Sequence, residues 1–233
     1  MSIFGKIFSK KPLSPEEVKE KNNKFIKKMG VSCNDVLPCI EAACDTKLKD
    51  LDSICKRAVA SLISIQLAIE IRNGKEYEEA KAFYLDLLNR FGVENELLDI
   101  EKRLFENEYE QRDIVNVIWT YECYWSLVWA LGLVETSDFK VPNEICDCGK
   151  ALSLVAKSGG FDNFKNKTAL RKKEEIVEML DLYYRYHWAC VEDSINRKAN
   201  IAALRPEVVV ERRRGLEWLV SEITDWNEIS LNT

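Results

Sequence analysis

Apolar residues recur every three or four positions along most of this chain, which is the spacing of an amphipathic helix. The pattern is clearest over residues 48–72, where Asn73-Gly74 then supplies a stop signal. Residues 76–91 repeat it and end at Gly92. No segment alternates apolar and polar residues for long enough to predict a strand. The pattern therefore predicts an all-α fold.

Turn and capping signals divide the rest of the chain into further helices. Ser14 can cap a helix that holds Pro15 in its first turn and Glu17 three residues after the cap, and Gly30 can end that helix. We also predict helices over 143–157, 171–197 and 206–223, and a short one inside the acidic segment 94–113, whose charges we interpret as a solvated face.

The most hydrophobic segment, residues 114–133, is predicted to form one central helix. Asn116, Glu122 and Ser126 interrupt its apolar run, so a helix buried by its neighbours is favoured over a membrane span. Together the patterns predict a single-domain, irregular bundle of about seven to nine helices over residues 14–233. The helices that contain Trp125, Tyr184 and Trp218 are expected at its centre.

Charge sets the amino terminus apart from this domain. Residues 1–28 hold eight lysines and three glutamates, which leaves 26 basic and 36 acidic residues in the remainder. We expect residues 1–13 to form a flexible basic leader. Phe4, Ile7 and Phe8 alternate with lysines there, so any membrane contact is expected to be confined to residues 1–11.

Composition narrows the class of protein. A net charge of -5 and a pI of about 5.3 argue against a nucleic-acid binder. The eight cysteines include no C-x-x-C pair, no signal peptide is recognised, and His187 is the single histidine. We therefore expect reduced thiols, a cytoplasmic location and no metal site. No phosphate-loop or dinucleotide-binding string occurs, so no cofactor is expected.

Several short strings in the second half of the chain share a family pattern. They are Trp119, Glu122, Trp129 to Gly132, Leu170-Arg171, Glu175-Ile176, Asp181 to Ala189, Val209 to Arg212, Trp218-Leu219 and Asp225-Trp226. The chain thereby resembles an uncharacterised bacterial family catalogued as domain of unknown function 4272. Lys172 and Glu217 depart from the family's usual Ser and Asn, which argues against essential chemistry at those two positions. The resemblance implies a mostly helical, intracellular bacterial protein and no known activity.

Two charged residues stand within apolar stripes. Glu122 falls among the tryptophans Trp119, Trp125 and Trp129 of the central segment, and Arg212 falls among the apolar positions of the last helix. A buried charge is costly unless it is paired, so we expect Glu122 to form an ion pair with Arg185 or Arg212.

The candidate polar cluster is completed by residues of the two last helices. Its members are Glu122, Asp181, Tyr184, Arg185, Glu211 and Arg212. Three interpretations stay open: a structural network, a ligand-binding pocket, or an acid and base pair for catalysis. The neighbouring Arg212-Arg213-Arg214 points in three directions on a helix and is interpreted as a solvated face. His187 and Cys190 fall on an apolar face without a third orienting residue.

These features favour a non-enzymatic intracellular module that binds a protein or a small molecule. The alternative is a small-molecule enzyme, such as a hydrolase, that uses the carboxylates and arginines of the cluster, although no catalytic residue can be assigned. Convergence of Glu122, Asp181 and Arg185 on a solvent-connected pocket would favour the enzyme, and a dry, mutually satisfied network would favour the binding module.

Overall fold

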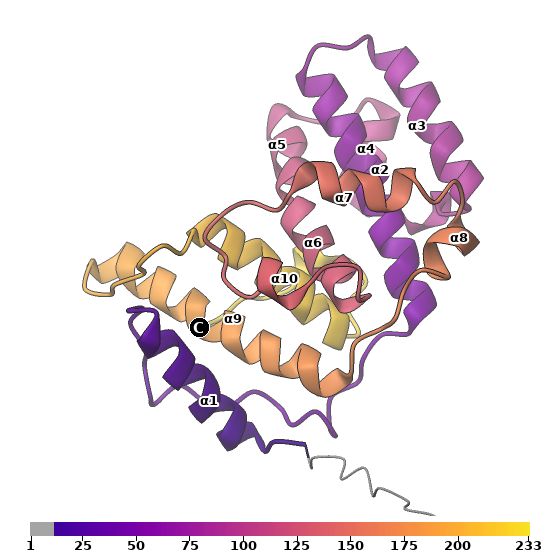
Figure 1. Ribbon diagram of the computed structural model, residues 1–233. Helices are drawn as coiled ribbons and strands as arrows, with labels where there is room; N and C mark the ends of the chain where they lie inside the picture. Colours follow the sequence, from indigo (N-terminus) through magenta and orange to yellow (C-terminus); the bar gives the residue numbers. More distant parts are fainter. Residues whose placement is uncertain (1–11) are drawn as a thin grey trace, which may run out of the picture.

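The computed structural model describes residues 12–233, and within that range every regular element is a helix (Figure 1). The all-α prediction is confirmed. One continuous hydrophobic core runs through these helices. None of them is both long enough and apolar enough to cross a membrane. Residues 1–11, which make up most of the expected leader, lie outside the described residues.

The elements follow one another in a simple order, with three short 3-10 helices between the α-helices. They are α1 (Pro15–Lys28), α2 (Leu51–Arg72), α3 (Tyr77–Phe91), η1 (Glu94–Glu96), α4 (Asp99–Glu106), α5 (Gln111–Trp119), α6 (Tyr121–Ala130), η2 (Thr136–Asp138), α7 (Cys148–Ala156), α8 (Phe161–Lys165), α9 (Lys173–Asn196), α10 (Pro206–Val220) and η3 (Trp226–Glu228).

The long helix α2 organises one side of the molecule. The Asp50 carboxylate caps it by accepting from the backbone N–H of Ser53 at 3.0 Å. Helix α3 returns along α2, and α4, α5 and α8 also pack against it (Figure 1). Its middle is buried on nearly every side, which explains why apolar residues there are not confined to one face of the helix.

The other side is built on α6, α9 and α10. Helix α10 packs against α6 on one side and α9 on the other, and α1 lies along α9 (Figure 1). The capping signal read at Ser14 is confirmed, because its hydroxyl accepts from the Glu17 backbone N–H and the Glu17 carboxylate accepts from that of Ser14. Residues far apart in sequence thus meet around α10.

The closest approach in this half is between α10 and α6. A Cβ atom on Gly215 would lie 2.7 Å from the carbonyl oxygen of Cys123 and 2.8 Å from the Cβ of Ser126. Ser126 also donates its hydroxyl hydrogen bond to the carbonyl oxygen of Arg212 at 2.9 Å. The absence of a side chain at Gly215 therefore lets the two backbones touch.

The expectation of one central helix over 114–133 is wrong. The chain turns at Thr120, whose N–H bonds back to Val117 and whose hydroxyl donates to the same carbonyl oxygen at 2.6 Å. Such local hydroxyl bonds compete with helix continuation. The turn separates α5 from α6 and places Trp119 on a different helix from Trp125.

The expected helix over 143–157 is shorter at its amino end. It begins at Cys148 after the N-cap Asp147, and residues 139–147 form an irregular loop. The loop carbonyls of Phe139 and Glu144 accept hydrogen bonds from Arg212 on α10. These polar contacts replace the intrahelical bonds that the periodicity had predicted.

We expect Gly215→Ala to destabilise the protein by about 1 to 3 kcal/mol, because the added methyl group overpacks the α6–α10 contact. Gly160→Ala is the matched control, since its Cβ would meet nothing within 4 Å. Urea denaturation of both variants measures the difference. Equal stability of the two variants would show that α6 and α10 do not approach this closely.

Candidate functional site

Glu122 and Arg212 form an ion pair in the interior between α6 and α10. The Arg212 Nε donates to Glu122 Oε2 at 2.7 Å, and each side chain is only 2% exposed. The sequence analysis predicted Arg185 or Arg212 as the partner of Glu122. The structure shows that the partner is Arg212.

The other polar side-chain atoms of this pair also form hydrogen bonds within the protein. Glu122 Oε1 accepts from the backbone N–H of Cys146 at 2.7 Å. The other guanidinium nitrogens of Arg212 donate to the carbonyl oxygens of Phe139 and Glu144 and to the Tyr183 hydroxyl. The pair therefore fixes the 139–147 loop and α9 to the α6–α10 core, as a buried pair must if it is to offset its desolvation.

Asp181 and Arg185 form a second, separate buried pair. Both lie on α9, where Arg185 Nε and Nη2 donate to the two Asp181 carboxylate oxygens at 2.8 and 2.6 Å. Asn22 of α1 also donates to Asp181 at 2.8 Å. The polar face of α9 is thus buried under α1, and its charges connect the two helices.

The last two members of the candidate polar cluster lie elsewhere. Glu211 accepts from Arg214 at 3.1 Å and from the Cys123 thiol at 3.2 Å. It lines a groove of about 590 Å³ beside Trp119. Tyr184 is half-buried, and the centre of its ring lies 5.0 Å from the guanidinium carbon of Arg213 in a cation–π contact. The six residues therefore do not meet in one pocket, and the expectation of a single cluster is wrong because α9 and α10 each direct charges to several neighbours.

The interpretation of Arg212-Arg213-Arg214 as a solvated face is also wrong. Arg212 and Arg213 are 2% and 3% exposed, and Arg214 is half-buried against Glu211. The three side chains do point in different directions, but each meets a carboxylate: Arg212 pairs with Glu122, Arg213 with Glu217 and Arg214 with Glu211. Neighbouring segments cover this helix on more than one side, which periodicity within a single helix cannot reveal.

His187 is held by Arg213 rather than by a catalytic partner. Arg213 Nη1 lies 2.6 Å from His187 Nδ1, and Arg213 Nη2 donates to the carbonyl oxygen of Asn232 at 2.9 Å. Burial, together with the positive Arg213 and Arg214, lowers the pKa of His187 to about 4. Burial also raises the pKa of Cys190 to about 12, so this thiol is a poor nucleophile.

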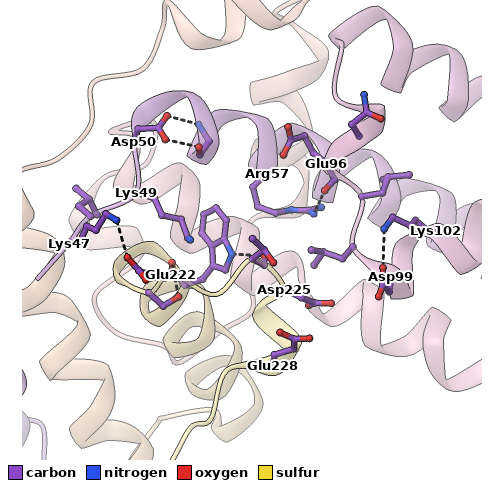
Figure 2. A pocket seen from close by; sticks show the side chains of 18 residues that line it. Lys47, Lys49, Asp50, Arg57, Glu96, Asp99, Lys102, Glu222, Asp225 and Glu228 are labelled. Carbon is purple, nitrogen blue, oxygen red and sulfur yellow. Dashed lines mark hydrogen bonds and ion pairs between the residues drawn. The ribbon is translucent and has the colours of Figure 1, made fainter.

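The largest concavity lies away from these pairs, at the amino end of α2. Its cavity of about 730 Å³ is bounded by residues 47–57, by residues 95–102, and by the segment from Trp218 to Glu228 (Figure 2). The Lys49 N–H donates to the Leu219 carbonyl oxygen at 2.9 Å and joins two of these walls. We call this concavity the charged cleft.

Ten charged side chains line the charged cleft. Six are carboxylates and four are cations: Asp50, Glu96, Asp99, Glu222, Asp225 and Glu228, against Lys47, Lys49, Arg57 and Lys102. Lys47 pairs with Glu222 and Lys102 with Asp99, each at 2.9 Å. Carboxylates are therefore in excess.

Arg57 forms the floor of the charged cleft and was missed by the sequence analysis. Its Nη2 donates to both carboxylate oxygens of Glu101 at 2.7 Å, and its guanidinium lies 5.0 Å from the Trp226 ring. Both charged residues are almost fully buried, so the segment 94–113 is not simply a solvated face. Arg57 lies outside the apolar stripe of α2, which runs through Cys55, Ala58, Leu62 and Ile65, and it shares a face with Ser61 and Ser64, so hydrophobic periodicity gave no signal for its burial.

Lys49 is the one cation of the cleft without an ion-pair partner within 4 Å in the described part of the chain. Its amine lies 4.7 Å from the centre of the Trp218 ring, and it extends into the cleft (Figure 2). Burial lowers the pKa of Lys49, opposed by the nearby Glu222 and Asp50. The Lys49 amine and the Trp218 ring therefore form a cation–π contact that is partly accessible to solvent.

Residues 12–233 contain no group of three or more His, Cys, Asp or Glu side chains arranged to hold a metal ion. A family model described as Domain of unknown function (DUF4272) matches residues 18–229. No curated protein and no solved structure matches the chain significantly.

Removing either member of the interior pair should leave an uncompensated buried charge. We expect Glu122→Ala and Arg212→Ala each to lower the free energy of unfolding by about 3 to 5 kcal/mol. The double variant should recover part of the summed loss, because the two residues act as one unit.

The exposed pair Glu20–Lys24, at 2.7 Å, is the matched control and should contribute less than about 1 kcal/mol. Denaturant titration of these three variants, of Glu20→Ala and of the wild type provides the comparison. Additive losses at Glu122 and Arg212 would contradict the assignment.

The lowered pKa of His187 makes stability depend on pH. Because the folded-state pKa of about 4 lies below the unfolded value of about 6.5, the unfolded chain binds the proton first. The stabilisation is therefore fully present above about pH 6.5 and is lost as pH falls toward about 4.

We expect the wild type to lose about 2 to 3 kcal/mol more stability than His187→Asn between about pH 7.5 and pH 4.5. Urea denaturation at both pH values measures this difference. Parallel losses in the two proteins would show that the pKa of His187 is not lowered in the folded protein.

Proposed function

The chain belongs to the family described as Domain of unknown function (DUF4272). We propose that it is a non-catalytic binding module whose charged cleft takes a cationic polypeptide segment. The observation that carries the proposal is the excess of carboxylates in the largest concavity. The family itself carries no assigned chemistry.

The buried pairs support a module over an enzyme. Glu122, Asp181 and Arg185 are all 2% exposed or less, and the carboxylate oxygens of Glu122 and Asp181 already accept hydrogen bonds from the protein. A general acid or base must reach substrate, directly or through one water molecule. These side chains are used to connect helices instead.

The unpaired charges of the charged cleft support a cationic ligand. Glu96 and Glu228 have no ion-pair partner within 4 Å among residues 12–233, and both line the cavity. Asp50 and Asp225 face it while they accept short hydrogen bonds from Ser53 and Asn227. Like charges gathered in a cleft concentrate the electric field there. A cleft rich in carboxylates therefore attracts a cationic ligand.

Lys49 indicates how such a ligand could dock. Its amine occupies the face of Trp218, which is the position that a lysine or arginine of a partner would prefer. A polypeptide also suits the elongated lining, which runs from residue 47 past Arg57 to residues 95–102. The partner in this proposal is therefore a protein with an accessible basic segment.

We further propose that the module works in the bacterial cytoplasm. The eight cysteines are free thiols in the structure, as expected in a reducing compartment.

The test is the binding of fluorescein-labelled decalysine, measured by fluorescence anisotropy. We expect decalysine to bind and labelled decaglutamate not to bind. The affinity should fall as salt rises from roughly 0.05 to 0.5 M, because the charges are accessible to screening ions.

The double variant Glu96→Gln, Glu228→Gln should weaken decalysine binding by about fivefold or more, which is about 1 kcal/mol. Glu108→Gln, Glu135→Gln is the control, because it removes the same charge from exposed positions outside the cleft. Equal weakening by both variants would assign binding to net charge alone and reject the charged cleft as the site.

A further inference from the structure

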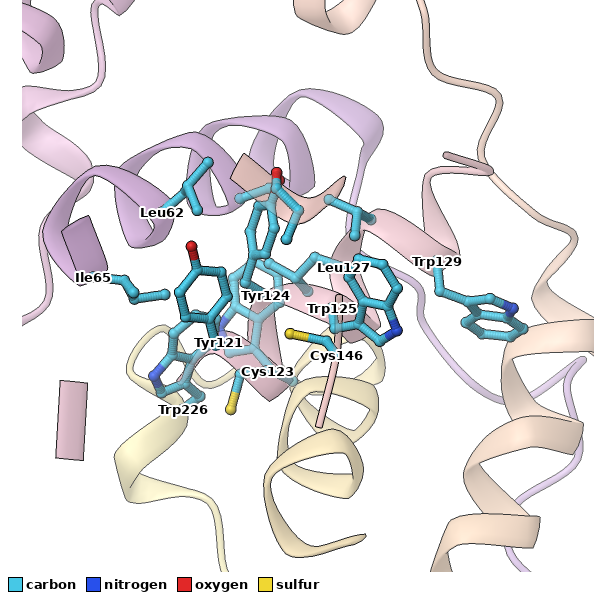
Figure 3. Close-up of a cluster of buried hydrophobic side chains, with 14 of the residues drawn as sticks. Leu62, Ile65, Tyr121, Cys123, Tyr124, Trp125, Leu127, Trp129, Cys146 and Trp226 are labelled. Atoms are coloured by element: carbon cyan, nitrogen blue, oxygen red, sulfur yellow. The ribbon is translucent and has the colours of Figure 1, made fainter. Parts of the chain in front are cut away.

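Two cysteines flank Asp147 where the 139–147 loop enters α7. Cys148 is the first residue of the helix and is exposed, whereas Cys146 is buried. Cys146 lies beside Trp125 in the core (Figure 3), and both residues line a cavity of about 680 Å³. An exposed thiol and a sheltered thiol are therefore separated by one residue at the edge of an open cavity.

The Cys148 thiol also contacts the backbone of Cys146. The Cys148 Sγ lies 3.6 Å from the Cys146 carbonyl oxygen. The neighbouring Cys146 side chain lowers the pKa of Cys148 to about 7, and the same interaction raises the pKa of Cys146. A thiol whose pKa lies near ambient pH combines a large thiolate fraction with good nucleophilicity.

The fold holds the buried thiol in place. The Cys146 N–H donates to Glu122 at 2.7 Å, and Arg212 donates to the carbonyl oxygen of Glu144. On the other side, the Asp147 carboxylate accepts from the Lys150 N–H at 2.9 Å and caps α7. The backbone is thus fixed on both sides of Cys146 by contacts that do not involve its sulfur.

We propose that Cys146 and Cys148 form a thiol–disulfide exchange site that reacts with small-molecule disulfides. The Cys148 thiolate attacks one sulfur of the disulfide, forms a mixed disulfide and releases the other sulfur as a thiolate. The Cys146 thiol then loses its proton and attacks the Cys148 sulfur, which forms the Cys146–Cys148 disulfide and releases the second thiolate. One small-molecule disulfide is reduced to two thiols while the two cysteines are oxidised, and their protons pass to the released thiolates at neutral pH.

The other cysteines lack this combination. Burial raises the pKa of Cys55 to about 11 and raises that of Cys123 well above its usual value. Cys44 is exposed but has no neighbouring cysteine two residues away. It is therefore a matched control for exposure without a resolving thiol.

The experiment treats the reduced protein with oxidised glutathione, blocks the remaining thiols with iodoacetamide, and maps tryptic peptides by mass spectrometry. Cleavage after Lys140 and Lys150 places both cysteines on the peptide 141–150. We expect this peptide to lose two thiols and to gain an internal disulfide without retaining glutathione. Cys44 lies on the peptide 29–47 together with Cys33 and Cys39, so fragmentation of that peptide locates the modified residue. Cys44 should react more slowly and stop at the mixed disulfide.

Two variants separate the steps of this reaction. Cys146→Ser should leave glutathione attached at Cys148, because the resolving thiol is absent. Cys148→Ser should leave Cys146 unreacted. Thermal melting of each variant shows whether it is folded.

The wild-type comparison with Cys44 does not depend on the stability of the variants. A mixed disulfide that persists at Cys148 in the wild type, or a Cys148 rate no higher than that of Cys44, would overturn the proposal. Neither result bears on decalysine binding, so the charged cleft is tested independently.

Discussion

The contact between α6 and α10 is the constraint on which the rest of the structure depends. Gly215 lets the two backbones touch, and the Glu122–Arg212 pair then lies in a space that excludes water. A pair placed there must satisfy all of its polar edges, and it does so with the 139–147 loop and with Tyr183 of α9. The loop, α9 and α10 are therefore positioned by one buried network.

The charged residues of this protein fall into two groups with different uses. Interior charges form ion pairs. The Arg57–Glu101 pair joins α2 to α4. The Asp181–Arg185 pair lies within α9, and Asn22 of α1 also donates to Asp181. Charges around the charged cleft are partly unpaired and open to solvent. Because a carboxylate that is already desolvated and hydrogen-bonded has little left to offer a ligand, we propose that binding involves the second group.

Much of the fold could be read from the sequence, and much of the site could not. Spacing and capping residues located most helices, and the cost of a buried charge was enough to infer that Glu122 needs an arginine. Periodicity treats a helix as having one buried face, so it could not show that Arg213 is covered or that Thr120 ends a helix through a local hydroxyl bond. The charged cleft joins three distant segments, and only the folded chain brings them together.

Hydrogen–deuterium exchange with and without decalysine tests the central claim most directly, because it reports on both groups of charges at once. The account predicts that α6 and α10 exchange slowest in the free protein, since their backbones pack within the buried network. It further predicts that decalysine slows exchange in residues 47–57, 94–102 and 218–228. Slower exchange confined to the 137–147 loop, or to the groove beside Trp119, would contradict the assignment of the charged cleft as the binding surface.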